Sequence, residues 1–417
     1  MSLLSLRQSA ERMIYRVAGL PVALAAALGG SDDPLHPAFT DSFWHPRSAG
    51  EWAELAGSLA LWPFGLLVAS AWFTARNGAV IRERTGKSVP AQLREQLSLY
   101  FSHGILPPWY YIFSLHDEGE RRAPTYIQRF ETKTCYFRLL KRRKGTPLND
   151  KSRFAEHCAK HGIRSVETLM TIDGAHPGMS LPDRDLFVKP QGGRGGRGAE
   201  RWDSIGPSTF ASPAGEQLTG EELLKQLVER SRERPLIVQP RMKPHPELAR
   251  ITSGALPTLR VLTCLNEKNE PEVMAAMIRT SFGANKTVDN LHAGGIGTLV
   301  DVDSGKLGKA SNLGADARLG WFSQHPDTGA PIEGTTVPCW EEVKRQAVRA
   351  HRAFDDRVVI GWDISVLEDG PIFIEGNGNP DLDILQRFMP IGLRAHRFAQ
   401  LLAHHLQQRR APMTTPA

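Results

Sequence analysis

Cysteine is scarce in this chain, and no arrangement of it suggests a metal centre or a disulfide framework. The 417 residues contain four cysteines that stand far apart, Cys135, Cys158, Cys264 and Cys339. The sequence has no CxxC pair and no cysteine–histidine spacing typical of zinc, which excludes a structural zinc site and a disulfide-stapled fold. Isolated thiols of this kind are typical of a reducing, cytosolic setting.

The chain also lacks a strong excess of charge of either sign. Its formal net charge is +6, spread along the whole length. This mild basicity suits a small anionic partner such as a nucleotide, and it is too weak to indicate nucleic acid. The densest basic run, Lys141–Lys144, is typical of a solvated surface. We therefore expect no nucleic-acid partner.

Uncharged apolar runs are confined to the N-terminal part. Val17–Leu28 is too short to span a bilayer as a helix. Leu55–Phe73 is nearly long enough, although it contains glycine, serine and Pro63. Three alternatives stay open for this apolar helical region, which covers residues 1–80. The helix crosses a membrane, lies on its surface, or is buried in a helical domain.

Helical patterns continue beyond this region and then give way to strands. Val89–Ser102 has the spacing of an amphipathic helix, and the aromatic segment Ile105–Phe113 is expected in the core. After about Leu181 the strands mix with helices and hairpins, which indicates an α+β fold. Further helices are expected at 126–140, 150–161, 220–230, 340–354 and 391–408, and strands at 185–190, 200–203, 235–240, 258–265, 272–280 and 297–303.

One loop, "KPQGGRGGRG" at Lys189–Gly198, is both rich in glycine and basic. Glycine lets consecutive backbone N–H groups surround an anion, and arginine can neutralise its charge. The loop satisfies GxGxxG, but no helix follows it, which excludes a dinucleotide-binding turn. A Walker A motif is absent as well. With Lys189 on the incoming strand, we expect the loop to close over phosphate groups; a flexible surface loop is the alternative.

A second segment, "GWDISVLEDGPIFIEGNGNPD" at Gly361–Asp381, is expected to form a hairpin around its Asp-Gly turn. Glu375 and Asn377 are two residues apart and therefore face the same side. Asp363 joins them if it pairs with Glu375. We expect a three-residue loop, Glu368–Gly370, to give this pairing, because a two-residue loop would place Asp363 on the opposite face. Such oxygen ligands suit Mg²⁺.

The order and separation of "FVKPQGGRGGRG", "LIVQPRMKPHPE" and "GWDISVLEDGPIFIEGNGNP" resemble the ATP-grasp superfamily, and most closely its sugar-transfer-associated branch, which is related to the alpha-L-glutamate ligases. The resemblance covers about residues 145–400. It implies an α+β ATP-grasp fold in which two subdomains grip ATP. We therefore expect a helical pre-domain at 81–145 and an ATP-grasp domain at 146–410, with a lid subdomain at about 181–240 and a metal-binding core at about 241–400.

The resemblance also implies roles for individual residues. Lys151 and Lys189 would bind phosphate, and a metal ion, Mg²⁺ or alternatively Mn²⁺, would be bound by Asp363, Glu375 and Asn377. The lid would consist of Gly193, Gly195, Gly196 and Gly198. The adenosine part would be bound by Gln239, Arg241, Met242 and Glu247, although Gln239 stands where the family usually has an acidic residue.

Two arginines on strands between these motifs are candidate catalytic residues. We expect Arg260 and Arg279 to face the transferred phosphate or an acceptor carboxylate; a surface position on a strand is the alternative for each. The glycine turn at Val288–Gly297, which includes Asp289, is expected to shape the acceptor pocket.

The activity implied by the resemblance is an ATP-dependent carboxylate–amine ligase that forms an acyl phosphate. Its partners would be ATP and a carboxylate or amine substrate, and the family's association with cell-surface polysaccharide genes suggests a sugar derivative. A phosphotransferase on the same fold and a non-catalytic nucleotide-binding scaffold stay open as alternatives. Because ATP is cytosolic, we expect a cytoplasmic protein, which residues 17–73 could hold at the cytoplasmic face of the inner membrane.

Overall fold

The structure is a computed structural model of the chain. It describes Val17, 19–24, Leu35, Thr40, Trp44, 48–140, 146–174, 179–192 and 198–409. The basic run Lys141–Lys144 lies outside the described residues, as does the end of Val17–Leu28.

The N-terminal part of the described chain is helical, as expected. Its main elements are α3 (Ala49–Thr85), α4 (Val89–His103), α5 (Pro107–Ile112), α6 (Gly119–Arg122) and α7 (Arg129–Leu139), with 3₁₀ turns η1 (Ala123–Thr125) and η2 (Pro147–Asn149). Ser88 caps α4 by accepting a hydrogen bond from the backbone N–H of Ala91, and Gly104 ends it in the left-handed conformation. The aromatic segment around α5 is core, since Tyr110 and Tyr111 are buried.

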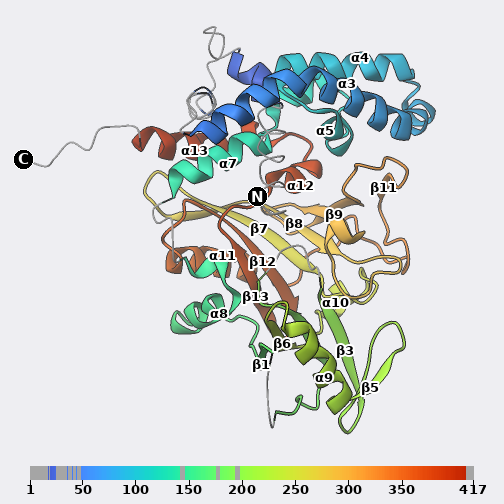
Figure 1. Ribbon diagram of the computed structural model, residues 1–417, viewed down its shortest axis with the longest axis vertical. Coiled ribbons are helices and arrows are strands. Elements are labelled where there is room, and N and C mark those ends of the chain that lie inside the picture. Colours follow the sequence, from blue (N-terminus) through green and yellow to red (C-terminus); the bar gives the residue numbers. More distant parts are fainter. Residues whose placement is uncertain are drawn as a thin grey trace, which may run out of the picture.

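Helix α3 is much longer than the apolar run that predicts it, and Pro63 lies inside it. It lies beside α4 at the end of the molecule opposite the smaller sheet (Figure 1). By length and composition it is a helix that could cross a membrane. The expected boundary at residue 80 falls within α3, and the division into domains stays a prediction.

The smaller sheet has the strand order β1 (Met170–Ile172), β6 (Leu236–Pro240), β2 (Leu186–Pro190), β3 (Glu200–Gly206), β4 (Thr209–Ala211), β5 (Gln217–Thr219). Helix α9 (Gly220–Ser231) covers one face, where Leu223 and Leu227 pack against Leu186 and Val188. A reciprocal capping box between Thr219 and Glu222 starts this helix. Because side chains alternate along a strand, Lys189 lies on the face turned away from α9.

The larger sheet is antiparallel throughout. Its strand order is β11 (Trp321–Phe322), β10 (Leu307–Ser311), β9 (Ile296–Val300), β8 (Pro271–Thr280), β7 (Thr258–Leu265), β12 (Val359–Leu367), β13 (Gly370–Asn377). Helices α8 (Lys151–Lys160) and α11 (Trp340–Ala353) pack on one face. The other face is covered by α7, α12 (Leu382–Arg387) and α13 (Arg397–Gln408) (Figure 1). Short turns α10 (Pro246–Ala249), η3 (Leu291–Ala293) and η4 (Leu393–Ala395) complete the described elements.

Two local predictions are wrong. The last helix begins at Arg397 rather than at residue 391, because residues 393–395 form a 3₁₀ turn and His396 is extended. The hairpin has a two-residue loop, since Leu367 pairs with Gly370. A β-bulge at Ile374 then shifts the register, so that Asp363 still pairs with Glu375. The predicted pairing is therefore confirmed, but the bulge produces it and not the loop.

Candidate functional site

Asp363 lies at the centre of a buried ionic cluster on the larger sheet. It pairs with Arg260 across β12 and β7. Arg260 donates from Nε to Oδ1 over 2.5 Å and from Nη2 to Oδ2 over 3.1 Å, and Arg279 of β8 donates to Oδ2 over 3.0 Å. Burial alone would raise the pKa of Asp363, but the two guanidinium groups outweigh it and lower the pKa to about 2. Asp363 is therefore ionised at neutral pH.

Glu375 and Asn377 lie on the same face as Asp363. Glu375 is directly opposite Asp363, and Asn377 is opposite Gly361. The Asn377 amide donates to Oε1 of Glu375 over 3.4 Å. The opposite face of this hairpin is closely packed: a Cβ on Gly376 would lie 2.5 Å from Cδ2 of Leu148 and 2.9 Å from the ring of Trp362. The glycine between the two polar residues therefore lets the hairpin pack against its core.

Arg279 is held by a second carboxylate. Its Nε lies 3.6 Å from Oδ2 of Asp289, and its Nη2 donates to Oγ1 of Thr258 over 2.5 Å. The backbone N–H and the hydroxyl of Thr258 both donate to Asp289. Burial would lower the pKa of Arg279, but Asp363 and Asp289 outweigh it and raise the pKa. The guanidinium is fixed from several sides, so its position is set before any ligand binds.

Lys189 of the smaller sheet interacts electrostatically with this cluster. It is partly buried on β2, and burial lowers its pKa to about 8. The negative charges of Glu375 and Asp363 oppose that shift, whereas the positive charge of Lys151 adds to it. Lys189 therefore interacts electrostatically with all three residues. Lys189 thus interacts electrostatically with carboxylates that stand more than 170 positions further along the chain.

Lys151 is the first residue of α8. Asp150 caps this helix, since its Oδ1 accepts from the backbone N–H groups of Ser152 and Arg153. Lys151 donates from Nζ to the carbonyl of Gln191 over 3.3 Å, and the Gln191 amide donates to Oγ of Ser152. The start of α8 is thereby tied to the residues that precede the glycine loop.

The four residues predicted to bind the adenosine part have different surroundings. Gln239 is buried and lies opposite Phe187, on the same face of the smaller sheet as Lys189. Arg241 instead forms ion pairs with Asp203 over 2.8 Å and with Asp185 over 3.4 Å. Their predicted roles stay predictions.

The remaining two predicted adenosine contacts differ in exposure. Met242 packs on a small apolar cluster that includes Leu367 and Ile372. Glu247 is exposed on α10, 3.8 Å from Arg250.

Three of the four glycines of the predicted lid, Gly193, Gly195 and Gly196, lie outside the described residues. Gly198 is described and has φ of +74°, a conformation that favours glycine. The flanking strands β2 and β3 pair with each other as predicted, so the loop connects two adjacent strands.

The donor set at Asp363, Glu375 and Asn377 fits Mg²⁺ by its chemistry. Within the described ranges, no group of three or more histidine, cysteine, aspartate or glutamate side chains could hold a metal ion. A magnesium ion bound to phosphate groups needs only one or two carboxylates from the protein, and all three side chains supply oxygen.

The model of a protein family described as sugar-transfer associated ATP-grasp matches residues 131–398. The chain belongs to this family. Its ATP-grasp fold, with two antiparallel sheets preceded by a helical region, is the one predicted. No curated protein matches this ATP-grasp chain.

Solved structures similar to this ATP-grasp protein share little sequence with it. An L-amino acid ligase from Bacillus licheniformis is 11% identical with a TM-score of 0.38, covering 67% of this chain and 53% of that chain. A D-alanine–D-alanine ligase from Helicobacter pylori is 12% identical with a TM-score of 0.34, covering 64% and 60%. A D-alanyl-alanine synthetase A from Vibrio cholerae is 13% identical with a TM-score of 0.36, covering 63% and 65%. The chain thus spans less than two thirds of each of these proteins, and likeness at this level does not identify its reaction.

The ionic cluster is larger than the sequence predicts. The sequence gives no signal for Thr258 and predicts for Asp289 only a role in shaping the acceptor pocket, whereas both residues contact Arg279. Thr258 begins a strand and has no motif around it. Only the pairing of β7 with β8, which places Thr258 opposite Arg279, brings the two together.

Proposed function

We propose that this chain is an ATP-dependent carboxylate–amine ligase that works through an acyl phosphate. The observation that carries the proposal is that the charges of Lys151, Asp363 and Glu375 all act on the partly buried Lys189 of the smaller sheet. Lysines bind the phosphate groups of a nucleotide, and carboxylates bind its divalent cation. Membership of an ATP-grasp family supports the same interpretation.

In this proposal Lys151 and Lys189 bind the phosphate chain, and the glycine loop closes over it. The segment from Gln239 at the end of β6 to Met242 contacts the base, and Glu247 contacts the ribose. Asp363, Glu375 and Asn377 would hold Mg²⁺, or Mn²⁺, which when bound neutralises charge on the phosphate groups.

The chemistry takes two steps. An oxygen of the substrate carboxylate attacks the γ-phosphorus, the bond to the leaving ADP oxygen breaks, and an acyl phosphate forms. The lone pair of an amine then attacks the acyl carbon, the bond to the phosphate oxygen breaks, and the nitrogen loses a proton as the amide forms. Arg260 and Arg279 are fixed cations of the ionic cluster, and such preorganised charge would stabilise the phosphate oxygens in both steps.

The substrate and the setting belong to the proposal as well. The family description, sugar-transfer associated, supports a sugar derivative as one substrate. Cell-surface polysaccharide metabolism is the setting that we propose for it. A cytoplasmic site of action follows from the need for ATP.

The test is a product analysis with the full chain, magnesium, ATP and a panel of sugar acids. Hydroxylamine replaces the unknown amine, because it converts any acyl phosphate into a stable hydroxamate. A hydroxamate formed together with ADP and phosphate, with ¹⁸O passing from the labelled carboxylate to phosphate, is the expected result. A phosphorylated substrate without free phosphate would identify a phosphotransferase instead. If calorimetry detects no binding of ATP with magnesium, the proposal is wrong.

A further inference from the structure

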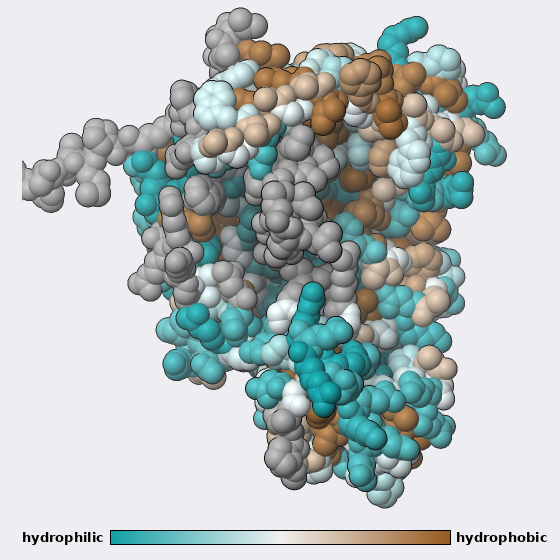
Figure 2. Space-filling model, viewed as in Figure 1, coloured by the Kyte–Doolittle hydropathy of each residue, from teal (hydrophilic) through white to brown (hydrophobic). Residues whose placement is uncertain are grey.

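The outer face of α3 is apolar over most of its length. No charged residue occurs between Glu54 and Arg76. Figure 2 shows hydrophobic residues gathered at this end of the molecule. Only 22% of the most apolar stretch of α3 is buried inside the protein. The large apolar side chains that remain exposed are Trp52, Leu59, Leu61, Phe64, Leu67, Val68 and Trp72 of α3 and Phe101 of α4, and Phe64 is 72% exposed. Five of them, Leu61, Phe64, Leu67, Val68 and Trp72, lie within about 140° of one another around the helix, and we call these five together with Phe101 the apolar face.

An exposed face of this size requires an explanation. Single apolar residues on a surface are common, but a contiguous group of aromatic and aliphatic side chains marks a binding surface. Trp72 stands at one end of it, and tryptophan is enriched where a protein meets the boundary between lipid and water.

The opposite side of α3 is attached to the protein along the helix. Leu55 and Leu66 pack in a cluster with Tyr100 and Phe130. Near the end of the helix, Thr74 accepts a hydrogen bond from the Gln96 amide over 2.7 Å. A helix that crossed the bilayer would have to carry these packed neighbours into the hydrocarbon core or lose them. The attachment therefore favours a helix that lies along a membrane over one that spans it.

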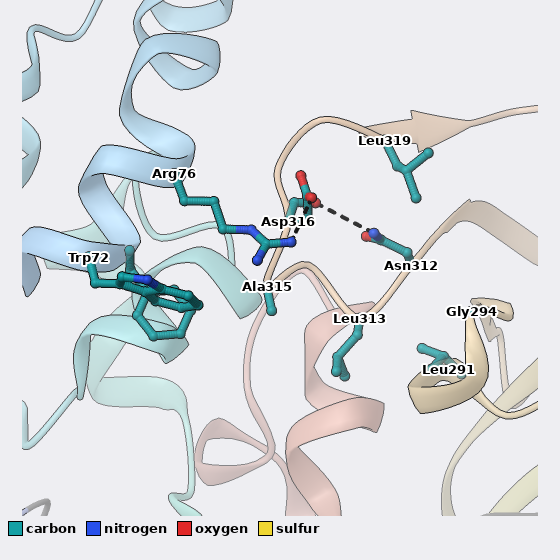
Figure 3. A pocket seen from close by; sticks show the side chains of 10 residues that line it. Trp72, Arg76, Leu291, Gly294, Asn312, Leu313, Ala315, Asp316 and Leu319 are labelled. Atoms are coloured by element: carbon teal, nitrogen blue, oxygen red, sulfur yellow. Dashed lines mark hydrogen bonds and ion pairs between the residues drawn. The ribbon is translucent and has the colours of Figure 1, made fainter. Parts of the chain in front are cut away.

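The end of α3 is also fixed to the ATP-grasp domain. Arg76 forms an ion pair with Asp316 over 3.0 Å. Asn77 accepts a hydrogen bond from the backbone N–H of Ala317 over 2.9 Å. A mostly apolar hollow of about 280 Å³ lies at this junction, and Trp72 and Leu291 are among its lining residues (Figure 3). Leu291 is two residues from Asp289, so the apolar face and the ionic cluster belong to neighbouring parts of one structure.

The charged residues beside the apolar face indicate which kind of surface it binds. Arg82 and Arg84 are exposed on the last turns of α3, and Arg94 is exposed on α4. The acidic residues among them are Glu83 and Glu95, and Glu95 is paired with Lys87, so this end of the border is basic on balance. Arg84 also donates to the backbone carbonyls of Ala317 and Arg318, which leaves Arg82 and Arg94 as the cations directed to solvent. Basic side chains next to a membrane-binding helix are attracted to anionic lipid headgroups.

We propose that the apolar face, α3 with Phe101, lies in the headgroup region of an anionic lipid bilayer, with the helix axis parallel to the membrane plane. The ATP-grasp domain would then work at the membrane surface. This inference rests on the apolar face and not on the proposed ligase reaction, so its failure would leave that reaction untouched.

The first experiment measures binding of the full chain to sedimenting vesicles. The vesicles contain phosphatidylcholine alone or with phosphatidylglycerol. We expect binding to both and tighter binding to the anionic vesicles, with the difference reduced by added salt. The double variant Phe64→Glu/Leu67→Glu should lower the partition coefficient at least about tenfold, because it removes two apolar groups and adds two negative charges.

A matched control changes an exposed apolar residue elsewhere. Ile205→Glu, on β3 of the smaller sheet, alters a side chain that is 52% exposed and far from α3 in sequence, and it should bind vesicles like the unmodified chain. Thermal unfolding and nucleotide binding establish that each variant is folded. The proposal is overturned if the unmodified chain ignores both vesicle types, or if the double variant binds as well as the control. It is also overturned if light scattering shows a stable dimer that only the double variant disperses, because a second copy then covers the face.

A second experiment distinguishes lying on the bilayer from crossing it. Single cysteines replace Leu61, Val68 or Trp72 in a Cys339→Ser chain and carry a fluorophore quenched by lipid-attached groups at known depths. These three positions lie on the same side of the helix, so a helix in the membrane plane puts them at the same shallow depth. If positions 61 and 72 differ in depth by most of the roughly 16 Å of helix between them, α3 spans the bilayer and the proposed arrangement is wrong.

Discussion

Nucleotide binding should weaken as the pH rises through 8, because Lys189 loses its positive charge there. Burial lowers the pKa of Lys189 to about 8, and Lys151 adds to that shift while Glu375 and Asp363 oppose it. A bound triphosphate stabilises the charged form and should return the pKa toward the ordinary value of a lysine, about 10.4. Binding above pH 8 is therefore coupled to the uptake of one proton.

The size of the effect follows from the fraction of Lys189 that carries a proton. With a pKa of about 8, that fraction is roughly nine-tenths at pH 7 and one-tenth at pH 9. The dissociation constant for ATP should thus rise about tenfold between pH 7 and pH 9, equivalent to about 1.4 kcal/mol of binding free energy. A lysine with an ordinary pKa would produce almost no change over the same range.

The assay is calorimetry of ATP binding at several pH values, repeated in two buffers with different ionisation enthalpies to count the protons taken up. Lys189→Arg should bind with a nearly constant affinity, because a guanidinium stays charged throughout. Lys225→Arg, an exposed position on α9, should keep the pH dependence of the unmodified chain. If the affinity of the unmodified chain is flat from pH 7 to pH 9, or if Lys189→Arg keeps the slope, Lys189 does not act as we describe.

Three further changes test other parts of the site. Glu375→Gln should reduce magnesium-dependent ADP release at least about a hundredfold. The control variant Glu368→Gln, at an exposed position in the hairpin loop, should keep full activity. If the two variants are equally active, Glu375 does not bind the metal ion. Gly376→Ala should lower the free energy of unfolding, measured by chemical denaturation, by about 1–3 kcal/mol, because the new Cβ would lie 2.5 Å from Leu148. The control variant Gly206→Ala has open space around the new Cβ, and its free energy of unfolding should fall by less than about 1 kcal/mol. Arg279→Met removes one partner of Asp363. The pKa of Asp363 is about 2, below its ordinary 3.8, so the ionised carboxylate stabilises the fold above about pH 4. This contribution to stability is lost as the pH falls toward 2. The variant should be less stable at pH 6 but lose less stability between pH 4 and pH 2.5, and a slope equal to that of the unmodified chain in urea titrations would contradict the ion pair.

Much of the site could be predicted because its residues stand in local patterns. Glu375 and Asn377 share a face through the two-residue repeat of a strand, and the chain turns back between β12 and β13 at Glu368-Asp369, beside the predicted Asp-Gly turn. Lys189 precedes a glycine loop between two strands, which both form and pair. These features depend on a few neighbouring residues and on backbone geometry, so they can be recognised in the sequence alone.

The membrane question shows the limit of such patterns. The uncharged run at Leu55–Phe73 is compatible with a spanning, a surface or a buried helix, since hydropathy does not record which side of a helix is covered. The structure shows that Leu55 and Leu66 are buried while Phe64 and Val68 are exposed. This division between faces, and not the composition, is what supports a surface helix.

The sequence by itself determined the ATP-grasp fold, the strands and helices that build it, and the residues at the hairpin and the glycine loop. Tertiary structure alone decided the register at Asp363 through the bulge at Ile374, and it alone brought Thr258 and Asp289 to Arg279. The physical reason is that propensity and periodicity act over a few residues. The partners of a buried charge are instead chosen by strand pairing across long stretches of chain, where desolvation makes an unpaired charge costly.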